Sequence, residues 1–290
     1  MAWEMVEEMR NGMLRRSVCL ALALCALACA LCPLCALAET PGGEPSALNG
    51  AQVPGGFWDR AQDSFTRTFI RDGRYRMVLS GLGVTLLITF ASGMLGTLLG
   101  FGLVRLRYRD IEALNRLISV YGSLIAGIPA VVILMVLYYI VFGAVQLSAV
   151  FVAIIGFTLI FGARAYGVIW STVSAVDGGQ REAALALGYT REQAFRQIVL
   201  PQSRPAALAL LQAQLVQLLK ETSMAGYITV LELTRASDMI RGQTKEAFFP
   251  LIAVTLVYYV LTRLLTRLVR LVDRHYDRQR KARRIKGVDE

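Results

Sequence analysis

Long apolar blocks are the feature that most constrains how this chain can fold. Five of them follow residue 76, and they lie at about 77–104, 117–142, 147–173, 206–230 and 248–271. A helix that crosses the hydrocarbon core of a bilayer needs about 20 mainly apolar residues, whereas helices in globular proteins average about 11–12. The blocks therefore predict an all-α integral membrane protein with five membrane-spanning helices.

The distribution of positive charge predicts the orientation of these helices. The chain carries a net charge of +10, and its arginines collect after the first block, between the third and fourth blocks, and after the fifth block. Lys and Arg accumulate on the cytoplasmic side of membrane proteins. Five crossings that start outside and end inside place all three arginine-rich segments in the cytoplasm. We therefore expect a multi-pass protein with a cytoplasmic C-terminus.

The most basic segment is the tail at 274–290, which continues a run of arginines that begins at Arg263. It lacks the series of aromatic side chains on which a single-strand binder stacks nucleobases. We therefore interpret it as a cytoplasmic tail in contact with anionic lipids, and we expect no nucleic-acid partner.

The first 38 residues have the pattern of a secretory signal peptide. Arginines precede an apolar stretch over 17–37, which ends in the small-residue pattern Ala36-Leu37-Ala38. The stretch is longer than the usual 7–15 or so residues, so an uncleaved anchor helix at 1–38 remains the alternative. The Gly- and Pro-rich segment that follows, with aromatic residues at helical spacing up to Phe69, predicts an extracytoplasmic linker and an interfacial helix over 39–72.

The sequence offers no catalytic or metal-binding pattern. All five cysteines lie between Cys19 and Cys35, inside the N-terminal apolar stretch, where Cys behaves as a small hydrophobic residue. The phosphate-binding loop G-x-x-x-x-G-K-[ST] of ATPases does not occur in the sequence. We expect no enzyme activity, no metal site and no bound cofactor in this chain.

The connection at 176–201 predicts two short helices joined by an elbow. Gly188 can adopt the left-handed conformation that ends the first helix, and Thr190 and Gln193 have the spacing of a capping box for the second. Pro201 disfavours helix at the preceding residue and predicts a boundary there. A compact, capped helix pair on the cytoplasmic side suits docking into another protein.

Seven positions of this connection carry a resemblance to a known family. They have the spacing EAA, three residues, G, nine residues, I-x-L-P, and they are Glu182, Ala183, Ala184, Gly188, Ile198, Leu200 and Pro201. The pattern resembles the EAA loop of ABC importer permeases. The resemblance implies a coupling helix that sits in a cleft of a separate ABC ATP-binding subunit. It also implies that the two alanines allow close approach, that Gly188 makes the bend and that Glu182 faces the ATPase.

The resemblance extends from about residue 70 to 275, and segments 218–223 and 230–235 are similar to the polar amino-acid, histidine/glutamine permease-like branch. It implies a five-helix, MetI-like importer permease core at 73–273. The implied function is the permease subunit of an ATP-driven importer for amino acids in the bacterial inner membrane. The implied partners are the ATP-binding subunit, which consumes the ATP, an extracytoplasmic solute-binding protein, and a second permease that is a copy or a relative.

The chain departs from that branch in two crossings. Residues 126–129 read Ala-Gly-Ile-Pro where the branch commonly has Arg-Gly-Thr-Pro, and Gly167 and Trp170 stand where it commonly has a Glu and an Arg. These departures favour an alternative: a membrane receptor or assembly subunit that docks an ATPase without carrying a solute. An ion-coupled transporter would have no use for an EAA loop.

Polar residues in the third and fourth blocks are candidates for a translocation path. Gln214, Gln217 and Glu221 share one helix face at i, i+3 and i+7, and Arg164 is the main charge of the third block. Polar residues inside spanning helices usually face a cavity, a partner or a substrate route. The alternative is that they make helix-to-helix hydrogen bonds, with Lys220 and Glu221 forming a pair.

A G-x-x-x-G pattern in the first block is formed by Gly96 and Gly100. The absence of side chains at this spacing lets two helices approach closely. We expect it to serve packing within the subunit, with a dimer contact as the alternative.

Overall fold

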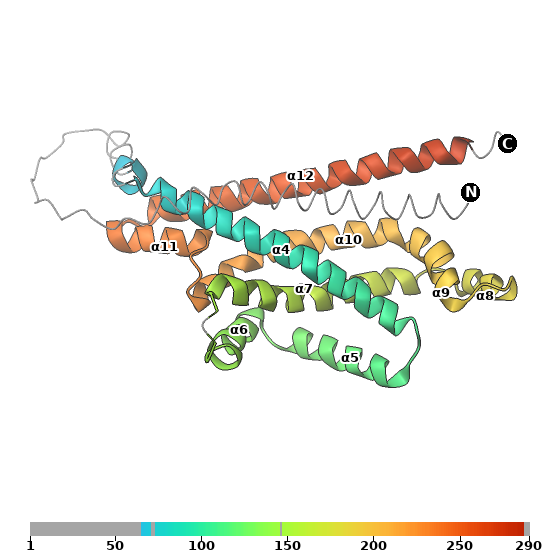
Figure 1. Cartoon of the computed structure of the whole chain (residues 1–290). Helices are drawn as coiled ribbons and strands as arrows, with labels where there is room; N and C mark the ends of the chain where they lie inside the picture. The colour runs from blue at the N-terminus through green and yellow to red at the C-terminus, as the bar shows by residue number, and fades with distance from the viewer. Residues whose placement is uncertain (1–64, 71–72, 146, 287–290) are drawn as a thin grey trace, which may run out of the picture.

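The computed structural model describes residues 65–70, 73–145 and 147–286, with side chains up to residue 269 apart from residue 67. The described residues form helices and no strand, and the long helices run side by side (Figure 1). The predicted all-α fold is confirmed. The predicted signal peptide or anchor at 1–38 and most of the linker at 39–72 lie outside the described residues.

Within the described residues, the longer helices and one bent pair run between two ends of the molecule (Figure 1). They are α4 (Tyr75–Arg107), α5 (Glu112–Gly127) with α6 (Ala130–Met135) and the π-helix η3 (Val136–Val141), α7 (Ala149–Ser174), α10 (Leu200–Glu221) and α12 (Phe248–Lys286). The short helices at one end are α8 (Gly178–Ala186) and α9 (Arg191–Ala194), and α11 (Leu233–Thr244) lies at the other (Figure 1). We call these the α8 end and the α11 end.

Three of the described helices, α4, α7 and α12, are long and apolar enough to cross a membrane, and the bent pair of α5 with α6–η3 adds a fourth if taken as one span. α10 does not meet the same limit, because Lys220, Glu221 and several glutamines interrupt its apolar sequence. It packs between α7 and α12, which gives its polar side chains neighbours other than lipid. α12 continues as a helix to Lys286, through most of the segment predicted as the tail.

The second crossing is not the single helix expected from block 117–142. Its two halves are bent by 106° at Ile128 and Pro129. Ile128 is extended (φ −112°, ψ 131°), because the ring of a following proline disfavours helical angles. Pro129 takes the N-cap position of α6, where its missing N–H interrupts no helical hydrogen bond.

The fourth crossing also differs from the predicted block at 206–230. A 3₁₀ helix, η5, follows α10 over Thr222–Ile228, and Thr229 closes it in the left-handed conformation with φ of 66°. The sequence does not predict α11, which begins shortly after. Most residues of α11 are polar, but Leu233, Ala236 and Ile240 are buried. Their spacing places them on one face of the helix.

Glycine lets α4 and α7 pack in close contact. A Cβ atom would lie 2.8 Å from Phe161 Cδ1 at Gly96, and 2.7 Å from the backbone N of Tyr166 at Gly100. Both partners belong to α7 of the same chain, so the predicted packing within the subunit is confirmed. The fully buried Phe157 lies one turn before Phe161 in α7 and belongs to the same core.

The described part of the predicted interfacial segment packs against the bundle. The short π-helix η1 covers Thr66–Ile70. The ring of Phe65 lies 5.2 Å from that of Phe69 and 6.1 Å from that of Phe249, at the start of α12. These aromatic contacts join the entry to α4 to the entry to α12.

Candidate functional site

α8 and α9 form the predicted elbow with its caps in place. Asp177 Oδ1 accepts a hydrogen bond from Gly179 N at 3.0 Å and caps α8. Gly188 ends this helix with φ of 85°, a conformation that favours glycine. Thr190 N donates to Gln193 Oε1 at 2.8 Å, and Gln193 N donates to Thr190 Oγ1 at 3.3 Å. The predicted capping box and left-handed elbow are therefore confirmed.

Pro201 does not interrupt the helix, contrary to the prediction. Leu200 has helical angles (φ −61°, ψ −43°), and α10 continues α9 through the π-helix η4 (Phe195–Val199). The Leu200 N–H donates to the Phe195 carbonyl, five residues back. This wider turn lies where Pro201 supplies no N–H to an ordinary helical bond. Leu200 and Pro201 thus join the elbow to α10 as one continuous helical run.

One face of the elbow is buried and the other is exposed. Of the seven residues of the EAA pattern, the exposed ones are Glu182, Ala183, Gly188 and Pro201, and the wholly or partly buried ones are Ala184, Ile198 and Leu200. Ala194 of α9 and Phe195 of η4 are also buried. The buried face fixes the elbow on the bundle, and Glu182 and Ala183 stay available to a partner.

Three apolar side chains on the exposed face were missed by sequence reasoning. Leu187 is 79% exposed, and Leu185 and Tyr189 are 39% and 37% exposed. We call these three residues the elbow patch. The sequence did carry a signal for them. Apolar residues at every second position around a glycine elbow cannot all face the buried side of one helix, so some of them must be exposed. Three exposed apolar side chains within five residues make this short segment a candidate contact surface.

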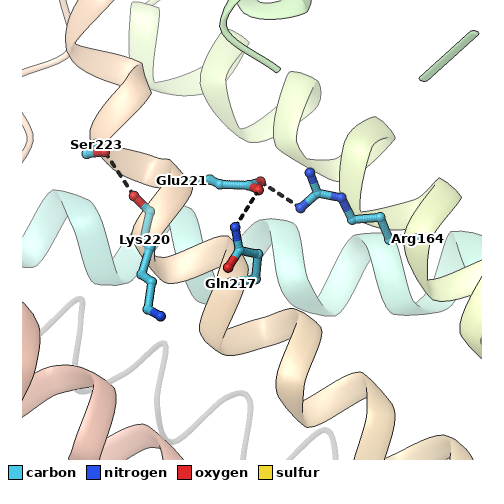
Figure 2. Close-up of polar contacts among 5 residues, drawn as sticks. All are labelled: Arg164, Gln217, Lys220, Glu221 and Ser223. Carbon is cyan, nitrogen blue, oxygen red and sulfur yellow. Dashed lines mark hydrogen bonds and ion pairs between the residues drawn. The ribbon is translucent and has the colours of Figure 1, made fainter. Parts of the chain in front are cut away.

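The predicted translocation residues come together in part (Figure 2). Arg164 Nη1 on α7 lies 2.7 Å from Glu221 Oε2 at the end of α10, and Gln217 Nε2 donates to Glu221 Oε1 at 3.1 Å. The Glu221 side chain is only 10% exposed and that of Arg164 is 31% exposed. A largely buried ion pair therefore joins the third and fourth crossings.

Other polar residues of α10 do not join this cluster. Gln214 is half-buried and makes no hydrogen bond to another residue in the described part of the chain, while Gln212 Nε2 donates to the Thr266 carbonyl on α12 at 3.2 Å. The Lys220 side chain points away from Glu221 (Figure 2). The predicted alternative pair of Lys220 with Glu221 is wrong, because neighbours in sequence project about 100° apart around a helix.

The two departures in the third crossing have different surroundings. Gly167 is exposed, with open space where a Cβ atom would lie. The Trp170 ring lies 4.8 Å from the guanidinium carbon of Arg107, and Arg107 Nη1 donates to the Tyr166 hydroxyl at 2.8 Å. A positive charge therefore reaches this part of α7 from α4.

The described residues thus combine long apolar helices, a largely buried ion pair between α7 and α10, and a capped elbow at one end. The chain belongs to the family described as "Binding-protein-dependent transport system inner membrane component", which matches residues 93–278. Membership confirms the resemblance drawn from the EAA pattern. The chain is a transmembrane permease of an importer.

Individual relatives agree with this family. The chain is 34% identical to "Probable amino-acid ABC transporter permease protein YckA" of Bacillus subtilis (strain 168) over 200 residues, which covers 69% of this chain and 88% of that protein. It is 28% identical to "L-cystine transport system permease protein TcyB" of the same strain, over 81% of this chain and 96% of that protein. These relatives do not favour the alternative of a docking receptor without transport.

Solved structures agree with the fold. A crystal structure of an amino acid ABC transporter with histidines matches with a TM-score of 0.65 and 27% identity, covering 77% of this chain and 100% of that chain. An inward-facing structure of the MetNI methionine ABC transporter matches with a TM-score of 0.59 and 19% identity over 69% of this chain and 95% of that chain. The predicted MetI-like importer permease fold is confirmed.

Proposed function

We propose that this permease imports amino acids and is driven by a separate ABC ATP-binding subunit that docks on the elbow at 176–201. Its other partners are an extracytoplasmic solute-binding protein and a second permease. The amino-acid solute is supported by the names of its relatives, which include amino-acid and L-cystine permeases. The permease forms the path, and hydrolysis takes place in the partner.

The elbow patch is the observation that supports the coupling role most strongly. Leu187 is 79% exposed on a segment whose other face is buried, so its apolar surface gains from contact with a partner. Glu182 and Ala183 are exposed on the same short helix. A small side chain at Ala183 lets a partner approach the helix backbone, and Gly188 sets the bend that presents the patch.

Positive charge supports a cytoplasmic position for the α8 end. Arginines gather there from the end of α4, the turn after it, α8, α9 and η4; they include Arg105, Arg109, Arg181, Arg191 and Arg196. Short cytoplasmic loops are enriched in Lys and Arg. The C-terminal part of α12 lies at the same end (Figure 1), which supports a cytoplasmic C-terminus in the bacterial inner membrane.

The cluster of Arg164, Gln217 and Glu221 is our candidate for the lining of the translocation path, with Gln214 on the same face of α10. Ionisable groups at membrane depth are costly and usually serve function. Gln217→Leu should lower amino-acid uptake while the ATPase stays bound. Gln212→Leu is the matched control, because Gln212 bonds to α12 and not to the cluster. Equal uptake in the two variants would instead support a purely structural role for the cluster.

Co-purification tests the coupling role. The tagged chain is purified in mild detergent from its host, beside Gly188→Val and the control Gly178→Ala. A Cβ atom has open space at both glycines, but only Gly188 is left-handed, so only Gly188→Val strains the elbow, by about 1–3 kcal/mol. We expect an ABC ATPase with the wild type and the control, and about tenfold less with Gly188→Val. Equal ATPase recovery from all three would contradict docking on the elbow.

A further inference from the structure

The turn between α4 and α5 is joined to the elbow by ion pairs. Arg105, in the last turn of α4, places its Nη2 atom 2.8 Å from Glu192 Oε1 on α9. In the turn itself, Asp110 Oδ2 lies 3.7 Å from Arg191 Nη1, also on α9. Two adjacent residues of α9 therefore pair with α4 and its turn: Glu192 with the end of α4, and Arg191 with the turn that follows.

An aromatic contact lies beside these ion pairs. The Tyr108 ring, directly after α4, packs on the buried Phe195 ring with centroids 4.5 Å apart. Burial raises the pKa of the Tyr108 hydroxyl, and the nearby guanidinium groups of Arg181 and Arg191 lower it in part. Tyr108 therefore lies near one residue each of α8, α9 and η4, namely Arg181, Arg191 and Phe195.

The turn itself is a short, hydrogen-bonded extension of α4. Tyr108 N, Arg109 N and Asp110 N donate to carbonyls of the last turn of the helix, at 2.9, 3.1 and 3.0 Å. Asp110 then reverses the chain in the left-handed conformation, with φ of 60°. Few residues therefore separate the end of α4 from the contacts to α9, and the turn is a short connection between the elbow and α4.

We propose that Arg105, Glu192 and Tyr108 are positioning residues that transmit movement of the elbow to α4, and through α4 to the path. This proposal rests on the proposed coupling function and adds the route by which coupling enters the bundle. α4 is suited to the role because Gly96 and Gly100 let it lie in close contact with α7.

We expect the ion pair of Arg105 with Glu192 to contribute little to the stability of the fold. The two side chains are 43% and 37% exposed, and exposed pairs contribute little to stability. This end is held by buried apolar residues, among them Val104, Ile118 and Phe195. Arg196 Nε also lies 3.7 Å from Glu192 Oε1 within the same helical run. Without Arg105, Glu192 therefore retains a partner but loses its link to α4.

A double-mutant cycle tests the proposal. The variants are Arg105→Gln, Glu192→Gln and the two combined, each in the full chain. The matched control is Glu112→Gln, which removes the 3.0 Å pair of Arg116 with Glu112 on α5. Each variant is assayed for retention of the co-purifying ATPase, for thermal unfolding, and for uptake of a labelled mixture of the common amino acids by cells that lack the native chain.

We expect each single variant to lower uptake by about 3- to 10-fold, with ATPase retention and thermal unfolding as in the wild type. The combined variant should lose no more than either single variant, because both remove the same link. Glu112→Gln should take up amino acids like the wild type.

Uptake at the wild-type level in both single variants, or losses that multiply in the combined variant, would overturn the proposed link. Loss of the ATPase from the single variants would assign the pair to docking instead and would also overturn it. Failure of the wild type itself to retain an ATPase would contradict the proposed function, and this proposal with it.

Discussion

The two ends of the molecule are joined in opposite ways. At the α11 end, Glu232 is fully buried, and its carboxylate accepts hydrogen bonds from Thr234 N and Arg235 N at 2.7 Å each and from the Tyr258 hydroxyl at 3.3 Å. At the α8 end, the contacts between elbow and bundle include ion pairs whose side chains are partly or largely exposed. The polar contacts are therefore buried at the α11 end, whereas at the α8 end they are partly or largely exposed and lie beside a buried apolar cluster.

α4 takes part in both ends. Near its start, a Cβ atom at Gly81 would lie 2.9 Å from the Glu232 carbonyl, and Thr85 Oγ1 accepts a hydrogen bond from Leu233 N at 3.2 Å. Near its other end, Arg105 meets the elbow. A buried polar group left without a partner is costly, whereas an exposed ion pair can exchange with water at little cost. The comparison suggests a helix fixed at the α11 end and adjustable at the α8 end.

Removal of the Glu232 carboxylate should break the α11 end and have the largest effect on stability. Glu232→Leu leaves two backbone N–H groups at the start of α11 without their acceptor, which should cost about 2–4 kcal/mol. Thermal unfolding in detergent measures the change. The control is Asp238→Asn, which removes an exposed 3.1 Å pair with Arg241 on the same helix. Equal unfolding midpoints for the two variants would contradict a stabilising role of the Glu232 carboxylate.

A methyl group on the close face of α4 should act next most strongly. Gly81→Ala places Cβ against backbone atoms of Glu232 and Leu233 at 2.9–3.0 Å, and we expect a loss of about 1–3 kcal/mol from overpacking. Gly83→Ala, two residues along, meets no atom within 4 Å and should be neutral or slightly stabilising. Thermal unfolding of this pair of variants isolates the contact. Similar unfolding midpoints for the two variants would mean that the start of α11 is not in close contact with α4 at Gly81.

The effect of pH on stability through Glu232 should be smaller than that of either substitution. It tests whether the carboxyl group at the α11 end is perturbed by burial. Burial raises the pKa of Glu232 above its ordinary value of 4.5, and hydrogen bonds from its neighbours lower it in part. The folded state therefore holds the proton more tightly than the unfolded state. The contribution of Glu232 to the free energy of unfolding should therefore be largest below pH 4.5 and should fall as pH rises through the raised pKa.

Unfolding of wild type and Glu232→Gln across this pH range measures the effect. Both proteins share every other titrating group, so the difference between their curves reports Glu232 alone. The wild type should lose stability relative to Glu232→Gln as pH rises. Parallel curves would show that the carboxyl group is not perturbed by burial.

The smallest change in stability is expected at the α8 end. Arg105→Gln removes a partly exposed ion pair and should change the free energy of unfolding by at most about 1 kcal/mol. Thermal unfolding beside Glu232→Leu provides the contrast. A loss as large as that of Glu232→Leu would remove the distinction between the two ends.

Local features of this fold could be predicted from the sequence because they carry their own hydrogen bonds. Gly188, Thr190 and Gln193 set the elbow through conformation and capping over a few residues. The three long helices α4, α7 and α12 follow from apolar length. The same kind of reasoning misjudged Pro201, since it ignored the wider helical turn that accommodates a missing N–H.

Contacts between distant residues could not be predicted in this way. Glu221 pairs with Arg164, 57 positions away, and not with the adjacent Lys220. Only the packing of α7 against α10 brings these groups together. Glu232 likewise depends on Tyr258 of α12 and on its own helix, so no short pattern announces a buried carboxylate. The candidate path was therefore predicted in residue type but not in pairing.

Leu187→Glu tests most directly the claim that the α8 end is the coupling surface. Leu187 is 79% exposed, so the added charge should not disturb folding of the chain, while it would be buried against a docked ATPase at high cost. Met239→Glu is the control, because it adds the same charge at a side chain 40% exposed on α11. We predict unchanged thermal unfolding in both variants, with the ATPase lost on purification from Leu187→Glu and retained by Met239→Glu. Retention of the ATPase by Leu187→Glu at the wild-type level would contradict the coupling role of the elbow patch.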